Sequence, residues 1–325
     1  MRRFAIVLAL ALALACSKKP DGPLVAKAEA ARVQARVPAI GYAWFTRDTQ
    51  EIGVAGDPKP SVFHAASIAK TMIGTSVMQL VVDKKLDLDA DVAQYVGFPV
   101  RHPRHPNVVI TLRLLLSHLV GIVDDFDTLQ APGDLQPFLR AYVSLPSHWG
   151  KDAPDGIKPR YSNVGSAIAA LAVERVAGRS FAEESEARIF RPLGMSSTQW
   201  DRRRAVYPVV DLQSTPSDLA RFGRAILRGG ELDGARILPA GETADMLQGK
   251  LGWQFTTIGS YAVIGHEGED KHASTGFYVD RVRGFGALAL ANGDAFSSGN
   301  KQRAAAIGDL LDALLTTAIR SRDAN

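Results

Sequence analysis

Cysteine is almost absent from this chain of 325 residues, in which Cys16 is the only one. A single cysteine excludes an intramolecular disulfide. The net charge is small: +4 for the whole chain, with 36 basic and 34 acidic residues once Arg2 and Arg3 are left out. No basic run interleaved with aromatic residues occurs, so the sequence gives no indication of nucleic-acid binding. The hydrophobic content of 46% is instead that of a globular protein with a large core.

Long apolar runs are absent after residue 15, so we expect no transmembrane helix there. At the N-terminus, Arg2 and Arg3 precede an apolar run over residues 4–15 that ends directly before Cys16. This pattern predicts a signal peptide over residues 1–16 and export to the cell envelope or periplasm. The residues 13–16, Ala-Leu-Ala-Cys, resemble a bacterial lipobox, although Ala13 stands where leucine is usual. We expect a lipid anchor on Cys16; the alternative is ordinary cleavage after Ala15.

The pattern of apolar residues predicts an α+β fold. Short strands are expected near both ends of the chain, and helices between them. The economical arrangement is one antiparallel sheet built from the N- and C-terminal segments, flanked by helices, with a helical subdomain inserted at about residues 83–205. Residues 17–37 are a linker with a short helix, and residues 38–325 form the main domain. The expected strands are 40–46, 50–54, 253–257, 261–265, 275–279 and 285–291, and the main helices are 67–82, 111–119, 163–176, 217–227 and 301–320.

Ser67 and Lys70 open the helix expected at 67–82, and their spacing places them on one face of it. That helix is apolar nearly all round, so it should be buried. Burial disfavours the charged form of a lysine, which could then take a proton from a serine hydroxyl. The sequence therefore makes Ser67 a candidate nucleophile and Lys70 a candidate base.

The same spacing occurs once more, at Ser298 and Lys301. That copy lies in a polar, glycine-containing stretch that reads as a loop. A loop neither removes water from the lysine nor fixes its distance to the serine. We therefore expect Ser298 to lie in a solvated turn without a chemical role.

Two further motifs carry candidate residues. Tyr161-Ser162-Asn163 stands directly before a predicted helix, where a tyrosine near a lysine cation would ionise more easily and shuttle a proton. Ser162 or Asn163 could equally serve as a simple helix N-cap. His266 and Gly268 follow an apolar strand and point to one face of it. A glycine there lets another backbone approach the strand closely, and a histidine can bond or protonate a substrate group.

Together, these motifs resemble those of the serine β-lactamase and penicillin-binding-protein superfamily, in particular its class C-like branch. The likeness covers roughly residues 40–319. Further landmarks of that superfamily are Lys85-Leu86-Asp87-Leu88-Asp89, Leu114-Leu115-Leu116-Ser117-His118 with Gly121, Arg191-Pro192-Leu193-Gly194-Met195, the segment 214–222, and Gly252-Trp253.

The resemblance implies a serine acyl hydrolase that forms an acyl-enzyme on Ser67 and acts on an ester, a D-amino-acid amide or peptide, or a β-lactam. Lys70 and Tyr161 would share the general-base work, with their order left open. Asn163 would bind the substrate amide, and His266 would stabilise a substrate carboxylate or protonate the leaving group. The backbone N–H groups of Ser67 and Glu269, the latter one past Gly268, would form the oxyanion hole.

The chain departs from the family pattern after Gly268, where Glu269, Asp270 and Lys271 follow instead of small residues; Glu267 adds to the charge. Acidic residues facing the cleft would repel an anionic substrate, which favours a neutral ester or amide over a β-lactam. The alternative function is a non-catalytic binding or sensor lipoprotein of the cell envelope that keeps the cleft.

No metal or organic cofactor is expected. His102 and His105 have the spacing of a metal pair, but prolines and arginines surround them and no further ligand is near, so a solvated loop is predicted. Asp124, Asp125 and Asp127 lack the ligand spacing of a calcium loop and are expected to form a polar loop after Gly121.

Overall fold

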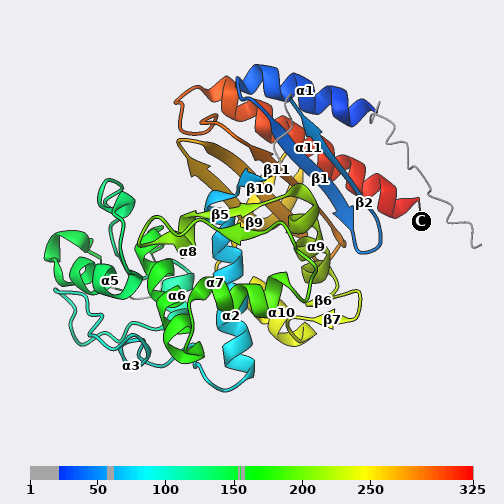
Figure 1. Cartoon of the computed structure of the whole chain (residues 1–325). Helices are drawn as coiled ribbons and strands as arrows, with labels where there is room; N and C mark the ends of the chain where they lie inside the picture. The colour runs from blue at the N-terminus through cyan, green and yellow to red at the C-terminus, as the bar shows by residue number, and fades with distance from the viewer. Residues whose placement is uncertain (1–21, 57–61, 153, 155–157, 325) are drawn as a thin grey trace, which may run out of the picture.

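The structure is a computed structural model that describes residues 22–56, 62–152, 154 and 158–324. At its centre lies a six-stranded antiparallel sheet in the order β2-β1-β11-β10-β9-β8 (Figure 1). The strands are β1 (Ile40–Thr46), β2 (Gln50–Ala55), β8 (Gln254–Ile258), β9 (Tyr261–Asp270), β10 (Ala273–Asp280) and β11 (Phe285–Ala291). The predicted α+β class, with one sheet built from both ends of the chain, is confirmed: β1 pairs with β11 over its whole length.

Helices cover both faces of this sheet. α1 (Pro23–Ala35) and α11 (Lys301–Asp323) pack against one face, and α9 (Pro216–Leu227) packs against the other (Figure 1). Successive side chains of β1 alternate between the faces. Tyr42 and Trp44 belong to the core under α1 and α11, whereas Ala43 and Phe45 belong to the core on the other side. Burial of both faces explains why β1 is apolar throughout instead of alternating.

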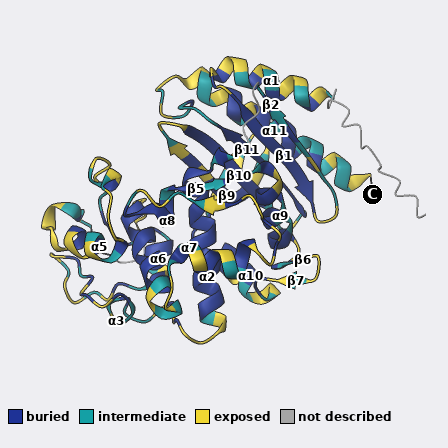
Figure 2. Cartoon of the chain, viewed as in Figure 1, coloured by how far each residue is buried: buried dark blue, intermediate teal, exposed yellow. Residues whose placement is uncertain are grey.

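The helical part of the molecule is built around α2 (Ala69–Val82) and α6 (Asn163–Ala177), which pack against each other. Figure 2 shows α2 buried along most of its length. Around them lie α3 (Ala93–Val96), α4 (Leu112–Leu116), α5 (Leu135–Ser144), α7 (Phe181–Ser185), α8 (Tyr207–Val210) and α10 (Ala240–Gln248). One continuous core joins these helices to the sheet, so the two parts share a hydrophobic interior. The limits of the insert at about 83–205 stay a prediction.

A small three-stranded sheet lies at the junction of the two parts. It has the order β3-β5-β4, with β3 (Phe63–His64), β5 (Leu212–Ser214) and β4 (Gln199–Trp200). None of these strands was expected from the sequence, because each is too short to show a periodic pattern. They matter for the site because β3 leads into Ser67 and β5 directly follows α8.

Two glycines let α2 lie directly against the chain that precedes β8. A Cβ at Gly74 would come within 2.0 Å of the carbonyl oxygen of Leu251. Gly252 has φ +76°, and a Cβ there would lie 2.3 Å from the carbonyl oxygen of Lys70. The first turn of α2, which carries Lys70, is therefore held against the segment leading into β8.

The predicted signal peptide and Cys16 lie outside the described residues. Within the parts of the chain that the structure does describe, none of the helices combines the length and apolar character needed to cross a bilayer.

Candidate active site

Ser67 and Lys70 lie at the start of α2, at the junction between the sheet and the helices. A 3₁₀ turn over Ala66–Ile68 precedes the α-helix, so Ser67 sits in the turn and Lys70 in the first helical turn. Lys70 Nζ lies 2.9 Å from Ser67 Oγ and donates a second hydrogen bond, of 3.0 Å, to the carbonyl oxygen of Val209. Lys70 is fully buried, as its apolar helix predicted.

Tyr161 reaches the same oxygen from the other side. Its hydroxyl donates to Ser67 Oγ at 3.0 Å, and its ring centroid lies 5.2 Å from Lys70 Nζ. The residue is 40% exposed, because one side of the ring faces the cavity described below. Ser67, Lys70 and Tyr161, which come from two distant parts of the sequence, thus form one hydrogen-bonded cluster.

The pKa values of the two candidate bases move in opposite directions. Burial lowers the pKa of Lys70 to about 7, against a smaller opposing effect of the nearby Asp124 carboxylate. Burial raises the pKa of Tyr161 well above its usual range, and Asp124 adds to that rise. The expectation that Tyr161 would ionise more easily is therefore wrong, because burial disfavours its phenolate more than the hydrogen bond with Ser67 stabilises it.

Asn163 is the first residue of α6, and Ser162 is the helix N-cap. Ser162 Oγ accepts a hydrogen bond from the N–H of Gly165 at 3.1 Å, so the capping alternative holds for Ser162. Asn163 lines the cavity and is 5% exposed, and its side-chain oxygen has no hydrogen-bond partner in the structure. A buried acceptor without a partner is costly, so this oxygen is available to a ligand N–H group.

Gly268 brings β9 close to the backbone in front of Ser67. A Cβ at Gly268 would lie 2.7 Å from the carbonyl oxygen of Ala65 and 2.2 Å from Thr275 Oγ1. The predicted close backbone approach at this glycine is confirmed. Ala66, directly before Ser67, has φ +47°, a left-handed conformation that costs a non-glycine residue about 1 kcal/mol. The chain thus bears local strain where it presents Ser67 to the β9 edge, and Glu269 lines the cavity beside it.

His266 lies on β9 and is buried. Burial lowers its pKa well below the usual histidine value, and the positive charge of Lys70 lowers it further. Its Nδ1 lies 2.5 Å from the carbonyl oxygen of Glu267, which fixes Nδ1 as the protonated nitrogen. Nε2 is then an acceptor, 3.5 Å from the side-chain nitrogen of Gln254. His266 is therefore neutral at pH 7 and supplies no positive charge for a substrate carboxylate.

A cavity of about 640 Å³ opens in front of this cluster. Ser67, Tyr161, Asn163 and His266 line one side. Its lining also includes the apolar side chains Phe126, Leu129 and Val210 and the charged residues Arg204, Glu267, Glu269, Asp270 and Lys271. The cavity lies where the helical part meets the sheet, a common place for a ligand site.

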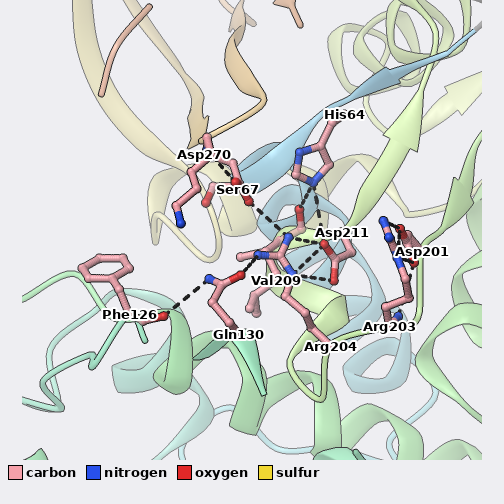
Figure 3. Close-up of polar contacts among 12 residues, drawn as sticks. His64, Ser67, Phe126, Gln130, Asp201, Arg203, Arg204, Val209, Asp211 and Asp270 are labelled. Atoms are coloured by element: carbon pink, nitrogen blue, oxygen red, sulfur yellow. Dashed lines mark hydrogen bonds and ion pairs between the residues drawn. The ribbon is translucent and has the colours of Figure 1, made fainter. Parts of the chain in front are cut away.

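Arg204 closes one end of the cavity and was not singled out by the sequence. Its Nε lies 2.9 Å from Asp211 Oδ1, its NH2 group lies 3.1 Å from Asp270 Oδ2, and its NH1 group donates to Gln130 Oε1 at 3.0 Å (Figure 3). His64 Nε2 lies 3.7 Å from Asp211 on the far side. The guanidinium is thus committed to neighbours on three sides, with two carboxylates for one cation.

The charged segment after Gly268 is part of β9, which runs to Asp270 instead of ending at Gly265 as predicted. Asp270 forms an ion pair with Arg204. Glu267, which also lines the cavity, accepts a hydrogen bond from the Tyr278 hydroxyl at 3.0 Å. The acidic crowding of the cleft that the sequence suggested is therefore partly relieved by pairing, which only the folded chain could reveal.

The remaining motifs have structural explanations. His102 is fully buried instead of solvated; its Nε2 bonds the carbonyl oxygen of Gly150 and its Nδ1 accepts the N–H of Arg104. The predicted solvated loop is therefore wrong for His102.

No group of three or more His, Cys, Asp or Glu residues that could hold a metal occurs in the described part of the chain. Ser298 Oγ donates to the carbonyl oxygen of Ala295 within a turn, as expected.

The sheet-and-helix fold, with a serine, a buried lysine and a tyrosine in hydrogen-bond contact at the junction, defines the class of penicillin-binding-protein-like serine hydrolases. The sequence model described as Beta-lactamase matches residues 28–312. The chain belongs to this beta-lactamase family, a family of serine hydrolases.

Similar proteins agree with this assignment. Penicillin-binding protein 4 of Amycolatopsis lactamdurans is 30% identical over 284 residues, which are 73% of this chain and 74% of that protein. The solved structure of D-amino acid amidase from Ochrobactrum anthropi SV3 complexed with L-phenylalanine has a TM-score of 0.75 at 19% identity, covering 93% of this chain and 100% of that one. A D-stereospecific amidohydrolase from Streptomyces sp. has a TM-score of 0.72 at 22% identity, covering 87% and 96%. The structural likenesses show the shared fold.

Proposed function

We propose that this protein hydrolyses a neutral amide or ester through an acyl-enzyme on Ser67. The observation that carries the proposal is the buried Lys70, whose Nζ lies 2.9 Å from Ser67 Oγ. The Ser67 hydroxyl proton passes to Lys70 as Oγ bonds the substrate carbonyl carbon. Backbone N–H groups of Ser67 and Glu269 would hold the oxyanion, and the leaving amine or alcohol departs with a proton. Water then attacks the ester carbonyl, releasing the acid and restoring Ser67.

Lys70 is the better first base of the two candidates. With a pKa of about 7, the Lys70 amine is neutral in about half of the molecules at neutral pH, whereas the raised pKa of Tyr161 makes its anion scarce. The carbonyl oxygen of Val209 accepts one Lys70 N–H, which turns the remaining valences of the nitrogen toward Ser67. Tyr161, bonded to the same serine oxygen, is placed to pass the proton on to the leaving group.

The charges around the cavity favour a substrate without a carboxylate. His266 is neutral, and Arg204 is already paired with Asp211 and Asp270. Lys271 lines the cavity but is exposed to solvent, where attraction to an anion is weak. This charge pattern supports a neutral amide or ester over a β-lactam or a peptide with a free C-terminus.

The cavity walls support an apolar acyl group that also carries an N–H donor. Phe126, which is 68% exposed, and Leu129 offer apolar surface, while the unpartnered oxygen of Asn163 needs a donor. An amino acid amide with an apolar side chain meets both requirements. D-amino acid amidase from Ochrobactrum anthropi SV3, one of the structural neighbours, has been solved in complex with such a compound, L-phenylalanine amide.

The decisive experiment uses two covalent serine probes on the wild-type protein and on Ser67→Ala. We expect a neutral fluorophosphonate to label the wild-type protein and not the variant, and a fluorescent penicillin, which carries a carboxylate, to label it at least tenfold more slowly. Phenylalanine amide and its methyl ester, in both enantiomers, then test turnover. Absence of Ser67-dependent labelling in a folded protein would refute the enzyme.

The second candidate function, a non-catalytic binder or sensor, is favoured by the charged residues Glu269, Asp270 and Lys271 in the cavity lining. It predicts that Ser67 is labelled but that the acyl group is not released. Time-resolved mass measurement after reaction with phenylalanine methyl ester separates the two functions, since a hydrolase releases the acyl group and returns to its unmodified mass, whereas a binder keeps it. The fluorophosphonate adduct is stable in both cases and reports only the reactivity of Ser67.

We further propose that the protein is exported and held at the envelope by a lipid on Cys16. The supporting observation is the sequence around Cys16 alone. Palmitate labelling of the wild-type protein that is lost in Cys16→Ser supports the anchor, and labelling that persists in Cys16→Ser contradicts it.

A further inference from the structure

Resting on the proposed function, we propose that Asp124 is a positioning residue that holds the Tyr161-Ser162-Asn163 segment at the start of α6, from where its negative charge acts on Lys70. The sequence indicated only a polar loop at this position. In the structure its carboxylate reaches from that loop to the N-terminus of α6, the helix that Tyr161 and Ser162 precede and that Asn163 begins.

Three donors of α6 and its cap converge on this one carboxylate. Ser162 Oγ donates to Asp124 Oδ1 at 2.7 Å, and the N–H of Val164 reaches the same oxygen at 3.3 Å. The N–H of Asn163 donates to Oδ2 at 2.6 Å. A carboxylate at a helix N-terminus also interacts favourably with the helix dipole. Asp124 therefore holds Ser162, Asn163 and Val164 in place, directly after Tyr161 in the chain.

The second effect is electrostatic. Asp124 is the carboxylate whose charge acts on both Lys70 and Tyr161. Its charge stabilises the Lys70 cation that forms when Ser67 loses its proton, and it disfavours a Tyr161 anion. It thereby reinforces the order of proton transfer in which Lys70 acts first.

The other groups that face Lys70 do not supply this charge. His118 and His266 are buried, and the pKa of each is lowered, to about 3 in His118, so both are neutral. His118 Nδ1 accepts the N–H of Ser162 at 3.3 Å. Asp211, which directly follows α8, is paired with Arg204. Removal of the Asp124 charge should therefore change the pKa of Lys70.

The test compares the pH dependence of Ser67 labelling by a neutral fluorophosphonate in Asp124→Asn and in the matched control Asp127→Asn. Asp127 is an exposed carboxylate of the same loop. In Asp124→Asn we expect the maximal labelling rate to fall about tenfold. The part of the rate–pH curve in which labelling rises with pH (its acidic limb) should move to lower pH by about half a unit or more, because loss of the anion lowers the pKa of Lys70. Asp127→Asn should leave both unchanged.

Two more variants separate the charge from the hydrogen bonds. Ser162→Ala removes one donor and keeps the charge, so we expect a slower rate with the limb unmoved. Asp124→Glu keeps the charge and should recover at least half of the rate lost in Asp124→Asn with the limb in place. An unmoved limb in folded Asp124→Asn would overturn the electrostatic role. If Asp124→Asn does not fold, an Asp124→Glu rate as low as that of Lys70→Ala would overturn the proposal.

A measurement without any substrate distinguishes failure of this proposal from failure of the proposed function. The pKa of Lys70 is followed by NMR of protein labelled with ¹³C-lysine, with Lys70→Ala used to assign the signal. We expect a lower pKa in Asp124→Asn than in Asp127→Asn even if wild-type protein takes no probe. Equal pKa values in the two variants would contradict the role of Asp124 while leaving the acyl-enzyme proposal intact.

Discussion

The chain contains the spacing Ser-x-x-Lys twice, and the two copies differ in the burial of the lysine and in the hydrogen-bond partners of the serine. Lys70 is fully buried, and its amine contacts Ser67 Oγ at 2.9 Å. Ser298 instead bonds the carbonyl oxygen of Ala295 and the N–H of Asn300, and Lys301 is exposed at the start of α11. The comparison teaches that the chemistry comes from desolvation and a fixed distance, both of which a buried helix supplies and an exposed turn does not.

The largest expected effect is that of removing the lysine from the first copy, compared with removing it from the second. Lys70→Ala should lower the rate of Ser67 acylation about a thousandfold, because the neutral amine that takes the serine proton is lost. Lys301→Ala should leave the rate unchanged. Rates of fluorophosphonate labelling, with circular dichroism as the folding control, decide the matter. Full activity in Lys70→Ala would remove the distinction between the copies.

The second prediction concerns pH. Only neutral Lys70 accepts a proton, so labelling of Ser67 should rise as pH increases through about 7, the pKa to which burial lowers this lysine. Between pH 5 and a plateau above pH 8 we expect roughly a hundredfold change, tenfold per pH unit below the pKa. A rate–pH curve with a neutral probe checks this, and a midpoint above 9 would mean that Lys70 is not desolvated in solution.

The third prediction uses the glycine that brings β9 against the Ser67 turn. A Cβ in Gly268→Ala would collide with the Ala65 carbonyl and Thr275, so the strand must move away from Ser67. We expect labelling to slow by tens of fold, because a displacement of about 1 Å at reacting groups is costly. The counterpart near the second copy is Gly299, where a Cβ meets no atom; Gly299→Asn, which tolerates the observed φ of +68°, should leave labelling unaffected. Equal labelling rates in the two variants would show that the position of β9 does not affect the reactivity of Ser67.

The fourth prediction tests whether the two carboxylates paired with Arg204 keep its guanidinium from binding an anionic ligand. Asp270→Asn removes one of the two carboxylates that pair with Arg204. The guanidinium then attracts an anionic ligand more strongly, so we expect the preference for a fluorescent penicillin over the neutral probe to rise about tenfold, or roughly 1.4 kcal/mol. Asp201→Asn, at an ion pair with Arg203 outside the cavity, is the control. An unchanged ratio would show that Arg204 does not set the charge preference.

The smallest effect is expected in α11, the helix that follows the second copy. Gly308 lies inside this helix, and a Cβ there would meet no atom within 4 Å. Gly308→Ala should raise the free energy of unfolding by about 0.5–1 kcal/mol through the lower entropy of the unfolded chain. Labelling of Ser67 should not change. Urea unfolding measures the first and the covalent probe the second; a decrease in stability would mean that this face of α11 is packed.

Much of the fold could be predicted because its elements follow simple patterns. The helix at 163–176 is found as α6, with Ser162 as N-cap and Gly178 in the left-handed conformation after its last turn. β11 matches its expected limits, 285–291, because a fully apolar strand is distinctive. β9 was predicted too short, since its charged end from Glu267 to Asp270 resembles a turn when the partner strand β10 is not considered.

The candidate site was predictable in part for the same reason. Ser67 and Lys70 are local to one helix, so their contact could be expected from spacing alone. Val209, Arg204 and Asp124 carry no motif, because they reach the cluster through backbone position or pairing across the fold. The direction of the Tyr161 pKa was mistaken because burial at the junction is invisible in the sequence.

The sequence by itself determined which serine and which lysine belong together, because helix periodicity and apolar neighbours are local properties of the chain. It also determined the strands from both ends that make one sheet. The tertiary structure alone decided how far Lys70 is desolvated, that Tyr161 and His266 are neutral, and that Arg204 is committed to two carboxylates. The reason is physical: charge states and pairings depend on solvent exclusion and on residues far apart in the chain, which only folding brings into contact.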